Sequence, residues 1–224
     1  MSTIETAQDG PAPSGRAAAH DSTQALLGQV MGYVAVTVGL TALGAYLGRD
    51  LSGGTGLLLF LVAFAGIFGL NAAAAAGREQ LAIGLLFGLG LVLGLAVAPV
   101  IADYADADPS ALWEAAGATA AFVAAAGAYG YATRRDLSSW ERTLFWALLG
   151  LIAFGLVAIF VSIPSANVIY AVAGLGIFGA FTIVDFNRLR RSNPDAAVPI
   201  AAGIFLDVFN VFLLALDLFG GRRD

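Results

Sequence analysis

The stretch QLAIGLLFGLGLVLGLAVAPVIA, residues 80–102, contains no charged side chain. A helix needs about 20 mostly apolar residues to cross the roughly 30 Å of hydrocarbon in a bilayer, and this stretch is long enough. A transmembrane β-strand would instead alternate apolar and polar residues over about 10 positions. Because the stretch is longer and continuously apolar, it predicts a membrane-spanning helix.

Runs of this kind recur along the chain and are separated by short polar connections. There are seven of them, at residues 25–48, 54–76, 80–102, 111–133, 141–163, 167–188 and 197–219. The chain is 59% hydrophobic and 12% charged, whereas a soluble domain carries about 25% charged residues. The sequence therefore predicts an all-α membrane protein, a seven-transmembrane-helix bundle over residues 24–220 with successive helices antiparallel.

The two ends of the chain differ from this region. Residues 1–23 are polar, contain Pro, Gly and Ser, and show no periodicity, which predicts a disordered cytoplasmic tail. They also lack the basic segment followed by an apolar core that marks a cleavable signal peptide. Residues 221–224 form a short C-terminal tail.

The distribution of arginine predicts the orientation in the membrane. Most arginines lie in the connections that follow even-numbered runs: Arg78, Arg134, Arg135, Arg142, Arg188, Arg190 and Arg191. Because cytoplasmic loops are enriched in basic residues, we expect the N-terminus to be cytoplasmic and the C-terminus outside, although Arg222 and Arg223 weigh against the last step. We expect a multi-pass protein of a prokaryotic cell membrane, and a pI near 4.7 with no lysine suggests a salt-adapted organism.

Residue types that are missing exclude several functions. The chain has no cysteine and a single histidine, His20 in the tail, so we expect neither a Cys- or His-based metal site nor a histidine general base. A retinal-binding protein needs a Schiff-base lysine, which is absent. We expect no enzymatic activity, no cofactor and no nucleic-acid partner. The expected partners are the lipid bilayer and a permeating ion, and no protein partner is identified.

Two aspartates lie deep inside apolar runs, where an ionisable residue costs about 2.5 kcal/mol or more to insert. They are Asp185 in FTIVDFNRLRR and Asp207 in AAGIFLDVFNVFLL. The short connection between the last two runs lets both carboxylates reach a similar depth. The seventh run carries a polar track on one face, which we expect to point into the bundle: Gly203, Asp207, Asn210, Leu214 and Asp217.

Close carboxylates in a low dielectric cannot both ionise cheaply, so Asp185 and Asp207 would share a proton and form a pH-sensitive gate. Calcium prefers oxygen ligands, and the two carboxylates together with Asn210 could form part of its path as transient ligands. Arg78, on the same predicted side, is the candidate counter-charge. The competing interpretation is that each aspartate only pairs with an arginine or caps the backbone, and that Arg78 only anchors the interface.

Three stretches together resemble the Bax inhibitor-1 family, also called the transmembrane Bax inhibitor motif family. They are GAYGYATRRDLS at residues 127–138, IVDFNRL at 183–189 and AAGIFLDVFNVF at 201–212. The Leu-Asp-x-x-Asn-x-Phe motif in the third stretch is the most specific. The seven-run layout matches as well, so the resemblance covers about residues 24–220 and is to a prokaryotic calcium leak member of the family.

The resemblance implies more than the spacing does. It implies that six helices surround the seventh, that calcium leaks across the membrane in a pH-dependent way, and that a helix-six and a helix-seven aspartate form the pH sensor. These aspartates correspond to Asp185 and Asp207, and the partner arginine at the end of helix two corresponds to Arg78. In eukaryotes the family is associated with suppression of cell death.

The leading hypothesis is therefore a pH-sensitive calcium leak channel gated by the Asp185–Asp207 pair. The alternative is a non-transporting membrane regulatory or interaction protein whose aspartate pair is structural. An intramembrane protease would also use two aspartates, but the glycines that usually flank them are absent from Val-Asp-Phe and Leu-Asp-Val.

Overall fold

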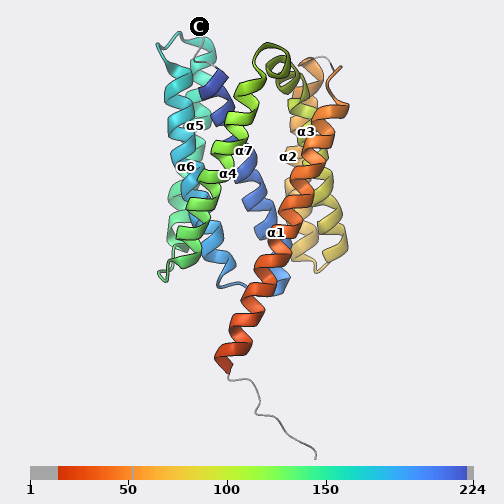
Figure 1. The fold of residues 1–224 in the computed structure, drawn as a ribbon, viewed down its shortest axis with the longest axis vertical. Helices are drawn as coiled ribbons and strands as arrows, with labels where there is room; N and C mark the ends of the chain where they lie inside the picture. The colour runs from red at the N-terminus through yellow and green to blue at the C-terminus, as the bar shows by residue number, and fades with distance from the viewer. Residues whose placement is uncertain (1–14, 52, 221–224) are drawn as a thin grey trace, which may run out of the picture.

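The computed structural model describes residues 15–51 and 53–220, and they form seven α-helices with one short 3-10 turn (Figure 1). The helices are α1 (Gly15–Leu47), α2 (Gly53–Ala75), α3 (Glu79–Ala107), α4 (Pro109–Ala132), α5 (Ser138–Phe160), α6 (Ala166–Leu189) and α7 (Ala197–Gly220), and the turn η1 is Pro194–Ala196. All seven helices contain a segment long and apolar enough to cross a membrane. No strand occurs in this described part of the chain, so the predicted all-α, seven-helix fold class is confirmed.

Two helices extend by five residues or more beyond the predicted runs. Helix α1 begins at Gly15, inside the stretch predicted to be disordered. That prediction is therefore wrong from residue 15 onward, because the alanines at positions 17–19 favour a helix and the polar composition masked this tendency. Residues 1–14 and 221–224 lie outside the described residues. Helix α3 continues to Ala107, past Asp103 and Asp106, because a helix can leave the hydrocarbon without ending.

The helices form two groups of three with α7 between them. Helix α3 packs against α1 and α2, and α6 packs against α4 and α5. Helix α7 contacts members of both groups, namely α1, α2, α3, α4 and α6, and in Figure 1 it runs between the α4–α6 group and the α1–α3 group. Of the seven membrane-spanning segments, that of α7 has the largest buried share. The fuller arrangement, with six helices around the seventh, stays a prediction.

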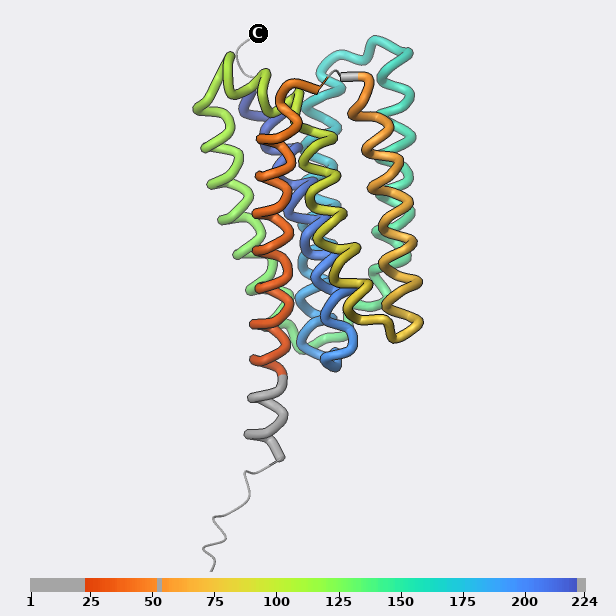
Figure 2. The backbone as a smooth tube through the Cα atoms, turned by 90° about the vertical axis from the view of Figure 1, so that its right-hand side faces the viewer, coloured from red at the N-terminus to blue at the C-terminus, as the bar shows by residue number. Residues whose placement is uncertain are grey.

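The connections divide cleanly between the two ends of the bundle. The α2–α3, α4–α5 and α6–α7 connections lie at the end where α1 begins, and the α1–α2, α3–α4 and α5–α6 connections lie at the other (Figure 2). Helix α7 ends at this second end, so it runs the full height of the bundle (Figure 2). We call the first end the arginine-rich end, since it carries the seven arginines named above.

Glycines on α3 allow α1 to approach at backbone distance. A Cβ atom on Gly90 would come within 2.6 Å of Thr37, and one on Gly94 would overlap the carbonyl of Thr41. The neighbouring pair with the same four-residue spacing, Gly84 and Gly88, faces open space. Small residues in a membrane favour helix association by such close packing, and of these two pairs only Gly90 and Gly94 serve this purpose.

We predict opposite effects for alanine at these two sites of α3. Gly94→Ala should lower the free energy of unfolding by about 1–3 kcal/mol, because the added methyl group meets backbone that cannot move aside. Gly84→Ala should be neutral, or stabilise by up to about 1 kcal/mol through higher helix propensity. Thermal unfolding in detergent of both variants checks this. Equal effects of the two substitutions would contradict the assigned α1–α3 contact.

Candidate functional site

The two predicted aspartates lie next to each other on facing helices. Asp207 on α7 is 5% exposed, and its Oδ2 atom is buried and accepts no hydrogen bond. Asp185 on α6 is half-buried, and its carboxylate fills the space that a side chain at Gly203 of α7 would occupy. The two carboxylates are near enough to interact electrostatically. Gly203 precedes Asp207 by one helical turn, so the absent side chain is what lets Asp185 approach α7.

The surroundings of the pair are mostly apolar. Ile204 and Phe205 on α7 and Phe186 on α6 are buried. Thr182, one turn before Asp185, is a polar residue beside the pair, and it is fully buried. Its hydroxyl lies beside the Asp207 carboxylate and donates a hydrogen bond to the carbonyl of Phe178 at 2.8 Å. A carboxylate in such a setting is costly when it is ionised and unpaired. The pair therefore combines close approach with poor solvation.

The two predicted gate partners make other contacts than with the aspartates. Arg78 is exposed in the α2–α3 turn, where Gly77 adopts a φ of 69° and the Arg78 amide donates to the carbonyl of Ala73 at 2.9 Å. The amide group of Asn210 donates to the carbonyl of Leu206 on its own helix at 2.7 Å. Within the described residues, neither side chain pairs with Asp185 or Asp207. Their roles as gate partners stay predictions.

A polar pocket of about 400 Å³ opens at the arginine-rich end and reaches Val184, the residue before Asp185. It is lined by Asp136, Ser138, Glu141, Val184, Arg188, Arg191 and Ser192. Glu141 on α5 and Arg188 on α6 are the charged neighbours of Asp185. The pocket thus brings polar and charged side chains of both signs to the edge of the buried pair.

Glu141 and Arg188 were not identified as site residues by sequence reasoning, which used the arginines only for orientation. A signal for Arg188 was present, because it follows Asp185 by three residues and so shares its helix face. Glu141 had no such signal, since its place beside Asp185 depends on how α5 packs against α6.

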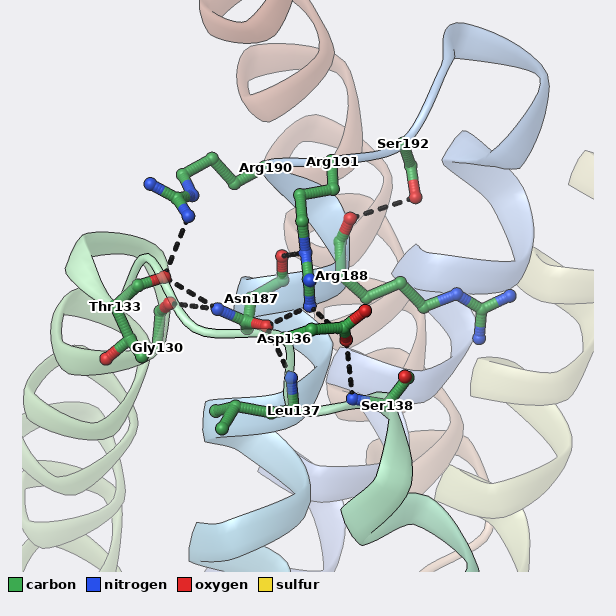
Figure 3. Close-up of polar contacts among 10 residues, drawn as sticks. All are labelled: Gly130, Thr133, Asp136, Leu137, Ser138, Asn187, Arg188, Arg190, Arg191 and Ser192. Carbon is green, nitrogen blue, oxygen red and sulfur yellow. Dashed lines mark hydrogen bonds and ion pairs between the residues drawn. The ribbon is translucent and has the colours of Figure 1, made fainter.

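One buried amide ties α6 to the end of α4, as Figure 3 shows. Asn187 is 0% exposed, and its Nδ2 atom donates to the carbonyl of Thr133 at 2.8 Å and to that of Gly130 at 3.2 Å. Its Oδ1 atom accepts from the amide of Leu137 at 3.3 Å and from the guanidinium of Arg191. All four hydrogen bonds join Asn187 to residues outside α6, in α4, in the α4–α5 connection or in the turn that follows α6. Asn187 lies two residues from Asp185, so it fixes the turn that carries this aspartate.

Two further contacts support this junction. The Arg190 guanidinium donates to the carbonyl of Thr133 at 2.8 Å, and Gly130 on α4 packs directly on the backbone of Ile183 on α6. The IVDFNRL stretch contains Asn187, but the pattern alone gave this residue no role. Its function depends on α4 carbonyls more than 50 residues earlier in the chain.

The carboxylate of Asp136 in the α4–α5 connection is held in its ionised form. The amide of Ser138 donates to it at 2.9 Å, and the guanidinium of Arg191 lies 2.9 Å away. The backbone and hydroxyl of Ser138, followed by Arg191, lower the pKa of Asp136 below its ordinary value. This ion pair is a second link between the α4–α5 connection and the end of α6.

We predict that Asn187→Ala lowers the free energy of unfolding by about 1–3 kcal/mol, because the carbonyl of Gly130 loses its side-chain donor while staying buried. Thermal unfolding in detergent measures the change. Asn71→Ala is the matched control: Asn71 is exposed and donates only to the carbonyl of Ile67 on its own helix, so its loss should cost under about 0.5 kcal/mol. Equal losses in the two variants would contradict the bridging role of Asn187.

The lowered pKa of Asp136 predicts a dependence of stability on pH. A group whose pKa is lower in the folded state stabilises above its unfolded pKa, and this contribution disappears as the pH falls through the folded value. Asp136 should therefore titrate below its ordinary value of 3.8. Carboxyl carbon chemical shifts recorded against pH measure it. Arg191→Gln should move the titration upward, and an unchanged midpoint would remove Arg191 as a cause.

Comparison with known proteins assigns the sequence to a family. Residues 23–224 match the family model described as inhibitor of apoptosis-promoting Bax1. An inner membrane protein of Escherichia coli, YbhL, is 31% identical over 118 residues, covering 47% of this chain and 50% of YbhL. A Golgi anti-apoptotic protein of vaccinia virus is 31% identical over 164 residues, covering 72% of this chain and 68% of its own. A Deinococcus radiodurans protein is 26% identical over 219 residues, covering 91% and 93%. The chain is a seven-helix membrane protein that belongs to the Bax inhibitor-1 family.

Proposed function

We propose that this protein is a pH-sensitive calcium leak channel of a prokaryotic cell membrane, with the Asp185–Asp207 pair as its gate. The observation that carries the proposal is the environment of Asp207. Its carboxylate is buried in a membrane-spanning helix, one of its oxygens accepts no hydrogen bond, and the nearest charged group is a second carboxylate. Intramembrane carboxylates of this kind usually mark an ion or proton path.

The polar pocket near Asp185 supports a transport role. The polar pocket lined by Asp136, Glu141 and Arg188 lies beside Asp185, and Asp185 lies beside Asp207. A cation would pass carboxylate oxygens in turn, first at the pocket and then at the pair. Such oxygens suit calcium, which is bound through carboxylates and carbonyls. In this proposal calcium is the transported ion, and the aspartates are transient ligands.

Gating follows from the number of protons on the pair. With one shared proton, the two carboxylates attract each other and hold α6 against α7. With none, they repel each other until a cation or a movement of α7 relieves the repulsion. The other charged groups facing Asp185 are Glu141 and Arg188, and they would shift the gating pH without forming the gate. Arg78, in the exposed α2–α3 turn at the same end, would add its counter-charge only after α2 or α7 moves.

The proposed orientation places the arginine-rich end in the cytoplasm, because basic residues concentrate on that side. The polar pocket and the aspartate pair would then face the cytoplasm, and α7 would end outside. The inner-membrane location in the name of the Escherichia coli relative agrees with a cell-membrane protein. The proposal includes no catalytic activity and no resident cofactor.

We expect calcium flux into proteoliposomes to change at least several-fold across a pH series, because a coupled carboxyl pair changes its charge as it loses its proton. Asp207→Asn should remove this pH response, because an amide carries no charge to gain or lose, and Asp185→Asn should reduce it. Sodium and proton flux recorded in the same vesicles identifies the preferred ion.

Asp217→Asn is the matched control for this experiment. Asp217 is half-buried on the same helix, ten residues beyond Asp207, so its substitution should leave the pH response intact. An unchanged pH response in Asp207→Asn would exclude the gate. If the wild type carries no ion at any pH, and Asp207→Asn alters only thermal stability, the chain is instead a non-transporting regulatory or interaction protein with a structural aspartate pair.

A further inference from the structure

A long apolar groove runs along the side of the bundle, away from the polar pocket. Its volume is about 1380 Å³. Helices α1 and α4 form its two walls, and α3 and α7 form its floor; Figure 1 shows α1 and α4 on either side of α7. Most of the lining is aliphatic or aromatic, including Val38 on α1, Val123 and Ala124 on α4, and Phe209 and Phe212 on α7. An apolar groove on a membrane-spanning surface takes up an apolar occupant.

The groove is long enough for the acyl chain of a lipid. Along α4 its lining extends from Trp113 to Ala128, and fifteen residues of helix rise about 22 Å. One leaflet contributes about half of the roughly 30 Å hydrocarbon thickness. The groove therefore exceeds the depth of one leaflet, and it runs parallel to the helices as a lipid chain does.

The end of the groove near the α1–α2 and α3–α4 connections is polar and carries charges of both signs. Arg49, Asp50 and Asp106 line it, together with Tyr46 and Trp113. Arg49 is only loosely held: its guanidinium lies 4.6 Å above the Tyr46 ring and 3.7 Å from Asp50, whose side chain is 91% exposed. A strong ion pair is closer to 2.7–2.9 Å. The guanidinium thus keeps donors for a further anion.

We propose that this groove binds a zwitterionic phospholipid with an amine headgroup, such as a phosphatidylethanolamine. Its phosphate would bind Arg49, since guanidinium groups match phosphate geometry. Its ammonium group would face Asp50 and Asp106, and one acyl chain would lie in the groove along α7. An anionic lipid offers no cation to the two carboxylates, and a wholly apolar occupant leaves Arg49 unused. The pattern of one cation and two anions therefore selects this headgroup.

The bound chain would lie against α7 close to the aspartates. The groove lining includes Val208 and Phe186, the residues that follow Asp207 and Asp185 in sequence. Lipid binding would thus support one position of α7 between the two helix groups. The proposal of a lipid site does not depend on ion transport, and its test uses binding alone.

Native mass spectrometry of the full-length protein, released from detergent with added phosphatidylethanolamine or phosphatidylglycerol, tests the site. We expect one phosphatidylethanolamine to be retained in preference to phosphatidylglycerol. Ala124→Trp fills the groove and should abolish this retention. Ala125→Trp is the matched control, because Ala125 is exposed on α4 and does not line the groove. It should behave as the wild type.

Arg49→Gln tests the headgroup contact without filling the groove. Losing one charge-assisted hydrogen bond to phosphate should weaken phosphatidylethanolamine binding about tenfold. Retention that is equal for both lipids and unchanged by Arg49→Gln would overturn the proposal. So would equal retention by Ala124→Trp and Ala125→Trp. A dimer in the wild type that Ala124→Trp abolishes would identify a second copy of the chain, and not a lipid, as the occupant.

Discussion

The absence of water from the hydrocarbon core governs most features of this molecule, because a polar group there needs a partner within the protein. Helices satisfy the backbone. Hydroxyl and amide side chains follow the same rule by donating to a carbonyl four residues earlier on their own helix, as Thr41, Thr119 and Asn210 do. Asp207 departs from the rule, since an acceptor-only carboxylate cannot use that arrangement and its Oδ2 atom accepts nothing. Within the described residues, the only other buried side-chain nitrogen or oxygen without a partner is Nε of Arg190, which lies just beyond the end of α6.

The two helix groups beside α7 are held together by different means. In the first, α1 and α3 approach to backbone distance at Gly90 and Gly94. In the second, α4 and α6 combine a close contact at Gly130 with the hydrogen bonds of Asn187. Both arrangements fix helices against backbone, which leaves little freedom inside either group. Helix α7 contacts both groups, and at Gly203 it meets the side chain of Asp185 instead of backbone.

The sequence predicted the features that depend on local properties of the chain, and it missed those that depend on contacts between distant segments. Run length and apolar content were sufficient for seven helices, because lipid permits few alternatives. The cost of a carboxylate in the membrane pointed to Asp185 and Asp207 without any tertiary information. Residues whose role depends on packing were missed: Asn187 needs the end of α4, and Glu141 needs α5 to lie on α6. Gly84 and Gly94 belong to glycine pairs with the same four-residue spacing. Only the arrangement of the helices shows that Gly84 faces open space and that Gly94 packs against α1.

Consecutive residues of α7 connect the candidate gate to the groove. Asp207 faces Asp185 and Thr182 on α6, whereas Val208 and Phe209 line the groove between α1 and α4. Adjacent residues on a helix point about 100° apart, so a rotation of α7 that separates Asp207 from Asp185 also displaces the wall of the groove. A chain lying in the groove would oppose that rotation, and an empty groove would not. The proton state of the pair and the occupancy of the groove would then bias one and the same movement of α7 from opposite faces, which links two sites that share no side chain.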